Sequence, residues 1–174
     1  SAGAMNPQIR FGEDLMSRVS YSMMNTGGDL EMTKAVIDGL NSLFKEITEE
    51  AKIDKNLILD SVFVCNPVMH HLLIGIDPFE LGQAPFSLAT SEQLNFSAKE
   101  INLEINPQAK TYILPCIAGH VGADAAAVAL SEAPNNSDDL VLIVDVGTNA
   151  EIMLGSKARG VLACSSPTGP AFEG

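Results

Sequence analysis

Apolar positions in the first third of the chain recur with a helical period. Apolar residues four positions apart predict a first helix: Phe11, Leu15, Val19 and Met23. The segment "NTGGD" interrupts this pattern, and Asp29 is then expected to cap a long helix whose apolar stripe runs from Met32 to Ala51. Both stripes are most simply interpreted as core packing.

The next segment predicts a strand followed by a short helix. Residues Leu57–Cys65 are rich in branched side chains and too few for a typical helix, which favours a buried strand. Asn66-Pro67 then supplies an N-cap and a first helical residue, and Gly75 supplies a stop. Residues 76–90 have turn chemistry and little periodicity, which predicts a long ordered loop.

The final part of the chain changes from this alternation to consecutive strands. A strand is expected at Thr111–Leu114, followed by an alanine-rich helix over residues 118–133. The polar segment "PNNSDD" then predicts a boundary, which divides the chain into residues 1–137 and 138–174. Three apolar runs follow and predict an antiparallel meander of two hairpins: Leu140–Val146, Ala150–Leu154 and Gly160–Ser165.

Composition narrows the functional classes. With a net charge of −12, the protein lacks the basic surface that nucleic-acid binding requires, and anionic membranes would repel it. No apolar run reaches the roughly 18 residues of a membrane span, and no signal peptide is visible. Cys65, Cys116 and Cys164 are widely spaced, which excludes the usual zinc-ribbon and iron–sulfur spacings and indicates reduced thiols in a cytoplasmic protein.

The tip between the first two predicted meander strands is the main candidate for chemistry. It contains Asp145, Gly147, Thr148 and Asn149. Successive backbone N–H groups at such a glycine turn can form an anion nest, and the acid suits a magnesium ion that arrives with a phosphate. The alternative is a plain hairpin whose Asp and Asn side chains make Asx turns. The motif alone leaves both readings open.

Other candidates carry weaker signals. His70 and His71 are neighbours on a short helix, so we expect one to face solvent and the other to be a polar rim residue rather than a metal ligand. Cys65 precedes a helix N-terminus, where a thiolate would be stabilised, but no partner base is identifiable, which favours a buried thiol. The segment Gly119–Gly122 fits an RNA-binding G-x-x-G loop, yet the acidic charge favours a helix start. Neither a Walker A nor a G-x-G-x-x-G motif occurs.

Five segments, taken together and in order, resemble one protein family. They are "MNPQIRFGEDLMSR", "NPVMHHLLIGIDPFELGQAPF", "LPCIAGHVGAD", "VDVGTNAEIMLG" and "SSPTGPAFEG". They resemble the C-terminal ATPase-type domain of the reductive activators of corrinoid enzymes, which belong to the superfamily of acetate and sugar kinases, heat-shock chaperones and actin. The resemblance implies an α/β fold. It places a ribonuclease-H-like, actin-like ATPase lobe without its opening hairpin over residues 1–137. Residues 138–174 are then the first three strands of a second lobe.

The resemblance also implies a function. Such activators return Co(II) corrinoid proteins to Co(I) with the help of ATP, which lies between two lobes, and an N-terminal ferredoxin-like domain carries a [2Fe–2S] cluster. This chain is therefore expected to be an inactive fragment on its own, which supplies one phosphate hairpin and a docking surface for a corrinoid protein or methyltransferase. Two departures concern nucleotide handling. Ala150 replaces a common glycine, and Cys65-Asn66-Pro67 replaces a common G-N-T.

The resemblance assigns ATP and magnesium to specific residues, with Asp145 holding the metal through water. The expected ligand-binding residues are Asp145, Gly147, Thr148, Asn149, Glu151, Gly169, Pro170 and Glu173, with Asp124 as a weaker candidate. Two alternative functions remain: a nucleotide-independent docking module for a corrinoid methyltransferase, and a kinase-like phosphotransferase. Because lobe-one and lobe-two sheets would have exposed edges, the meander is also expected to pair with the first sheet, within its own chain or in a homodimer.

Overall fold

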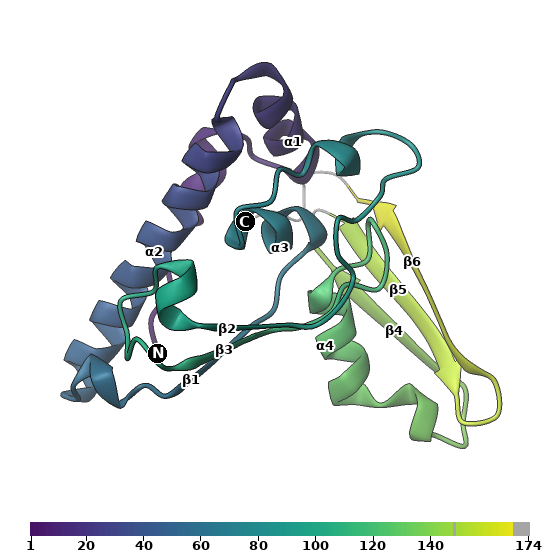
Figure 1. The fold of residues 1–174 in the computed structure, drawn as a ribbon. Helices are drawn as coiled ribbons and strands as arrows, with labels where there is room; N and C mark the ends of the chain where they lie inside the picture. The colour runs from purple at the N-terminus through teal and green to yellow at the C-terminus, as the bar shows by residue number, and fades with distance from the viewer. Residues whose placement is uncertain (148, 169–174) are drawn as a thin grey trace.

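The computed structural model describes residues 1–147 and 149–168 of the chain. In this part the helices are α1 (Leu15–Met24), α2 (Gly28–Ala51), α3 (Pro67–Leu73) and α4 (Ala123–Glu132). The strands are β1 (Asp60–Phe63), β2 (Leu94–Ser97), β3 (Lys110–Ile113), β4 (Val141–Val146), β5 (Asn149–Ser156) and β6 (Gly160–Pro167). They form two separate sheets, ordered β1-β3-β2 and β4-β5-β6, with α4 leading from one to the other (Figure 1).

The first sheet is mixed, and helices cover one of its faces. β3 pairs in parallel with β1 and antiparallel with β2. Figure 1 shows α2 and α3 on the same side of this sheet, where Val36, Leu73 and Ile113 share one hydrophobic core. The prediction of a buried strand over Leu57–Cys65 is wrong in length and burial, because only one face is covered and Val62 on β1 remains 63% exposed. Strand β2 was not predicted.

The start of α2 differs from the sequence expectation. The N-cap is Gly27, whose φ of 79° lies in the left-handed region that glycine adopts without a steric penalty. Asp29 is therefore inside the first turn rather than at the cap. There its negative charge lies near the positive end of the helix dipole, which still stabilises the helix.

Helix α3 is enclosed on several sides. Asn66 caps it as predicted, because its side-chain oxygen accepts a hydrogen bond from the backbone N–H of Met69 at 2.9 Å. The expectation that one of its two histidines faces solvent is wrong, since His70 and His71 are 0% and 1% exposed. His71 Nδ1 lies 2.8 Å from the carbonyl oxygen of Pro67, and Nε2 accepts a bond from the backbone N–H of Ala89. The ring thereby ties α3 to the following loop.

The second sheet is the antiparallel meander that the sequence predicts. Every residue from Val141 to Val146 on β4 has a partner on β5, and β5 pairs with β6 in the same way. The backbone N–H of Lys157 donates to the carbonyl oxygen of Ser137 at 2.8 Å. This bond holds the β5–β6 turn beside the short 3-10 helix Pro134–Asn136. Within the described ranges the meander pairs with no strand of the first sheet, so the expectation of such pairing within one chain is wrong.

None of the helices in the described ranges is both long enough and apolar enough to cross a membrane.

Candidate functional site

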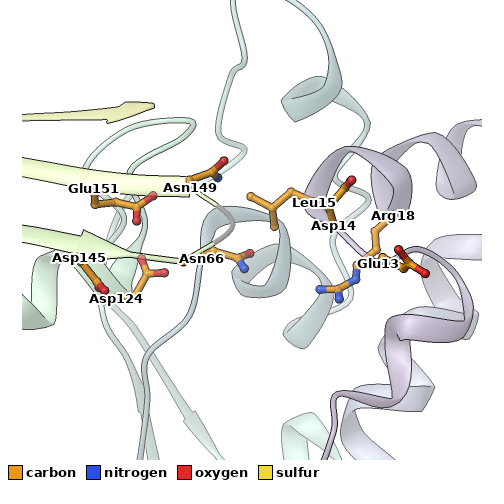
Figure 2. Close-up of a pocket in the computed structure, with 10 residues that line it drawn as sticks. Glu13, Asp14, Leu15, Arg18, Asn66, Asp124, Asp145, Asn149 and Glu151 are labelled. Carbon is orange, nitrogen blue, oxygen red and sulfur yellow. The ribbon is translucent and has the colours of Figure 1, made fainter. Parts of the chain in front are cut away.

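A cleft of about 310 Å³ lies where α1, α3, α4 and the β4–β5 hairpin meet. Its lining comes from sequence segments that are far apart: Glu13, Asp14, Leu15, Arg18, Asn66, Asp124, Asp145, Gly147, Asn149 and Glu151. Figure 2 shows the hairpin carboxylates and Asp124 on one side, Arg18 and Glu13 on the other, and Asn66 between them. Five of these side chains are carboxylic acids and one is a guanidinium, so the cleft is strongly acidic.

The hairpin side of the cleft places two acids next to a glycine turn. Asp145 and Glu151 are direct cross-strand partners of β4 and β5. Like charges in such a pair are destabilising, so this pair would gain from a bound cation. The backbone N–H of Gly147 donates to the carbonyl oxygen of Asn149 at 2.8 Å, which closes the turn. Among the described residues apart from its chain neighbours, an alanine Cβ at Gly147 would lie within 4 Å of the Asn149 carbonyl oxygen alone, at 3.7 Å.

A third acid reaches the cleft from the start of α4. The backbone N–H of Ala123 donates to the carbonyl of Cys65 at 2.9 Å, which places this helix start beside the end of the β1 segment. Burial, and then the charge of Asp145, raise the pKa of Asp124, although a bond from the Ala125 N–H opposes this. Burial also raises the pKa of Glu151, and the charges of Asp124 and Asp145 add to that shift, while a bond from the hydroxyl of Ser165 opposes it. The charge of Asp145 therefore contributes to the raised pKa of both Asp124 and Glu151.

The opposite side of the cleft is built from the start of α1. The carboxylate of Asp14 accepts a hydrogen bond from the backbone N–H of Ser17 at 2.7 Å, and the backbone N–H of Asp14 donates to the hydroxyl oxygen of Ser17 at 3.0 Å, which forms a capping box. Arg18 lies one turn further along the helix, and its Nε donates to the carbonyl oxygen of Gly12 at 3.0 Å. The helix cap thus fixes where the guanidinium group enters the cleft.

Comparison with known proteins places this geometry in a family. The chain matches the model of the RACo middle region over residues 1–135, and the model of the C-terminal domain of RACo, the ASKHA domain, over residues 139–174. The chain belongs to the RACo family. The corrinoid activation enzyme RamQ of Eubacterium limosum is 32% identical over 170 residues, which are 98% of this chain and 28% of that enzyme.

A solved structure of the RACo type has the same fold. A reductive activator for corrinoid, iron–sulfur protein superposes with a TM-score of 0.94 at 35% identity, over 99% of this chain and 27% of that one. The RACo-family chain therefore spans less than a third of the length of these two relatives. The predicted fold class, an actin-like ATPase lobe followed by a three-stranded meander, is confirmed. The domain division at residues 137 and 138 stays a prediction.

The RACo-family structure brings together the predicted site residues that it describes. The cleft contains Asp145, Gly147, Asn149 and Glu151, together with the weaker candidate Asp124. Thr148, Gly169, Pro170 and Glu173 lie outside the described residues. The α1 residues that line the cleft, Arg18 among them, were not predicted, and Asn66 was connected with nucleotide handling only through the departure at Cys65-Asn66-Pro67. Arg18 is part of the family-like segment "MNPQIRFGEDLMSR", but nothing local in that segment indicates that it meets a hairpin more than a hundred positions away.

The cleft acids do not form a protein-only metal cage. In the described ranges, no three His, Cys, Asp or Glu side chains are arranged to hold a metal ion. All three cysteines are free thiols, and burial raises the pKa of Cys65 to about 12 and that of Cys116 to about 11. These protonated thiols are poor metal ligands. The oxygen donors of the cleft instead suit a magnesium ion that retains water and phosphate ligands.

Proposed function

We propose that this chain is the nucleotide-binding part of an ATP-dependent reductive activator, which returns Co(II) corrinoid proteins to Co(I). One observation carries this proposal: a single cleft combines the glycine turn of the β4–β5 hairpin with five carboxylates and one guanidinium. This combination suits a polyphosphate that arrives with a divalent cation. Membership in the RACo family supports the corrinoid role, and the ASKHA match over residues 139–174 supports the choice of nucleotide.

The residues of the hairpin have distinct roles in this proposal. Asp145 holds magnesium through water, as the resemblance implies, and Glu151 adds a second oxygen donor beside it. Asn149 binds phosphate oxygens through its side-chain amide, whereas Gly147, whose own backbone N–H closes the turn, leaves room for the phosphate to approach. Bound Mg-ATP supplies the free energy for an uphill one-electron reduction of cobalt.

The electron itself does not pass through a centre built from this chain. The resemblance places the electron carrier, a [2Fe–2S] cluster, in a separate ferredoxin-like domain, and Cys65, Cys116 and Cys164 do not have the usual iron–sulfur spacing. The contribution of these residues is to bind the nucleotide and to present a surface to the corrinoid protein.

Calorimetric titration of the intact protein that contains these residues tests the nucleotide site. We expect Mg-ATP to bind, and Asp145→Ala to raise its dissociation constant about 10- to 100-fold, because a metal-linked carboxylate is lost. Asp138→Ala removes the same charge from an exposed position outside the cleft and is expected to change nothing. An Asp145→Ala protein that binds Mg-ATP like the wild type contradicts the assignment.

The partner is tested separately. A corrinoid methyltransferase component is captured on the immobilised protein with and without Mg-ATP, and we expect the amount retained to depend on the nucleotide. Equal retention in both conditions would instead support a nucleotide-independent docking module. Transfer of the terminal phosphate to an acceptor, followed with labelled ATP, would support the kinase-like alternative.

A homodimer is a further part of the proposal. Each sheet has two edge strands in the described part of the chain, and such edges favour pairing between copies. Light scattering measures the molar mass directly, and a monomeric mass at all concentrations would contradict the proposed homodimer.

A further inference from the structure

Arg18 has an unusual place among the charged side chains of the cleft. It carries the single positive charge among the lining residues in the part of the chain that the structure describes. The residue is only 8% exposed, although a long charged side chain normally extends into water. Figure 2 shows its guanidinium group turned toward the middle of the cleft, on the side opposite the hairpin acids. Its positive charge is therefore held inside the cleft, where a bound ligand could reach it.

Two contacts fix the orientation of this group. Nε donates to the carbonyl oxygen of Gly12, and Nη1 lies 3.5 Å from the sulfur of Met69 on α3. The carbonyl oxygen of Gly12 can approach Arg18 because residue 12 has no side chain. A Cβ at this position would lie 2.7 Å from the backbone nitrogen of Arg18. The guanidinium plane is thus set before any ligand enters, which reduces the entropy lost on binding.

The charge balance of the cleft indicates what this group would bind. The hairpin side, with Asp145 and Glu151, repels a bare anion and attracts a cation. A polyphosphate with bound metal presents both charges, because the metal faces the acids and free phosphate oxygens remain elsewhere. A guanidinium group on the opposite wall matches those oxygens with two parallel N–H donors.

We propose that Arg18 is a phosphate-binding residue, which contacts the polyphosphate of a metal-bound nucleotide from the α1 side of the cleft. The inference rests on the proposed nucleotide function and adds to it the residue that recognises phosphate charge on the wall facing the hairpin. Because Arg18 belongs to α1 and Asp145 to β4, the same ligand would join the first sheet's helices to the meander.

Arginine variants of the intact protein test this inference. We expect Arg18→Gln to raise the dissociation constant of Mg-ATP about 10- to 100-fold, since a charge-assisted pair of hydrogen bonds is lost. Arg10→Gln is the matched control, because Arg10 is exposed, stacks on Phe11 and does not line the cleft. It should bind like the wild type. Where Arg18→Gln does not fold, Arg18→Met retains the apolar stem near Met69 and replaces it in the test.

Salt dependence separates phosphate binding from a structural role. Added salt screens a charge contact, so the affinity of the wild type should fall with ionic strength, and that of Arg18→Gln should fall less steeply. Arg18→Lys should restore the steeper slope and part of the affinity, because it restores the charge without the planar fork. Parallel slopes for all variants, with a lower melting temperature, would show a structural residue and overturn the inference.

The remaining outcomes are distinguishable. If Asp145→Ala loses binding while Arg18→Gln binds Mg-ATP like the wild type, the nucleotide site stands and the role of Arg18 is wrong. If the wild type binds no Mg-ATP, the proposed function fails and this inference fails with it.

Discussion

Substituting Gly122 with alanine should disturb the cleft without replacing any residue of its lining. Gly122 has a φ of −88° and a ψ of −169°, an extended conformation that alanine also adopts, so the substitution adds only a Cβ atom. That atom would lie 2.5 Å from Oδ1 of Asp124, 2.7 Å from Cα of Asn66 and 2.8 Å from Cδ of Pro67. All three separations are shorter than the van der Waals contact distance of about 3.5–4.0 Å between carbon atoms.

The size of the effect follows from which neighbours can move. The carboxylate of Asp124 can rotate, but the contacts to Asn66 and Pro67 involve the rigid start of α3, so α3 and α4 must separate. Overpacking of this kind costs about 1–3 kcal/mol. For a chain of this size, 1 kcal/mol corresponds to about 2–4 °C, so the melting temperature should fall by about 2–12 °C. Separation also moves Asn66 away from Asp124, which should weaken Mg-ATP binding.

Calorimetry measures both consequences on the same protein. Differential scanning gives the melting temperature, and isothermal titration gives the dissociation constant of Mg-ATP. Gly3→Ala is the control, since a Cβ at Gly3 has no neighbour within 4 Å. An unchanged melting temperature for Gly122→Ala would refute the steric argument. A lower melting temperature with unchanged affinity would refute the link between the two helix starts and the nucleotide.

Three further substitutions test separate parts of the structure. Asn66→Ala should lower the free energy of unfolding by about 1 kcal/mol, because α3 loses its cap, whereas Asn66→Asp should retain it; urea titration compares them. Burial lowers the pKa of His70 from 6.5 to about 4, so its contribution to stability is complete above pH 6.5 and is lost as the pH falls through about 4. His70→Leu should flatten that decline in urea titrations across this range, and an unchanged slope would contradict the assignment. Asp124→Asn should lower the pKa of Glu151, since one of the charges that raise it is removed, and carboxyl NMR titration detects the shift or its absence.

The parts of the fold that local chemistry determines could be predicted from the sequence. Asn66-Pro67 fixes the start of α3 within a few residues, and the turns of the meander are short enough for each strand to meet its neighbour along the chain. Strand β2 could not be predicted in this way. Its four residues have no strong alternation, and they become a strand only because β3, more than ten positions later, offers a partner edge.

Burial on α3 was mispredicted for a related reason. His70 and His71 are adjacent, and on an isolated helix they would face different directions. Helix α3 is short and has α1, α2 and the 76–90 loop packed around it, so both rings are enclosed. The burial of both rings therefore depends on tertiary packing, which the spacing of residues along one helix cannot predict.

The candidate site shows the same division. Asp145 and Gly147 could be predicted from the local turn motif, and the resemblance added Glu151 and, as a weaker candidate, Asp124. Arg18 could not be predicted, because its place depends on how α1 packs on α3 and on a close approach at Gly12. The sequence therefore predicted the hairpin wall of the cleft but not the wall that α1 forms with Arg18.

The two walls together argue against an inert acidic groove. Asp145 faces Glu151 directly across a strand pair, and the charge of Asp145 also raises the pKa of Asp124. Such repulsion destabilises the fold unless a cation offsets it, and Arg18 on the opposite wall carries a positive charge that phosphate oxygens can meet. A ligand that brings a cation to the hairpin acids and phosphate oxygens to Arg18 would stabilise both groups. A metal-bound polyphosphate has this charge distribution, and neither a bare metal ion nor a bare phosphate does.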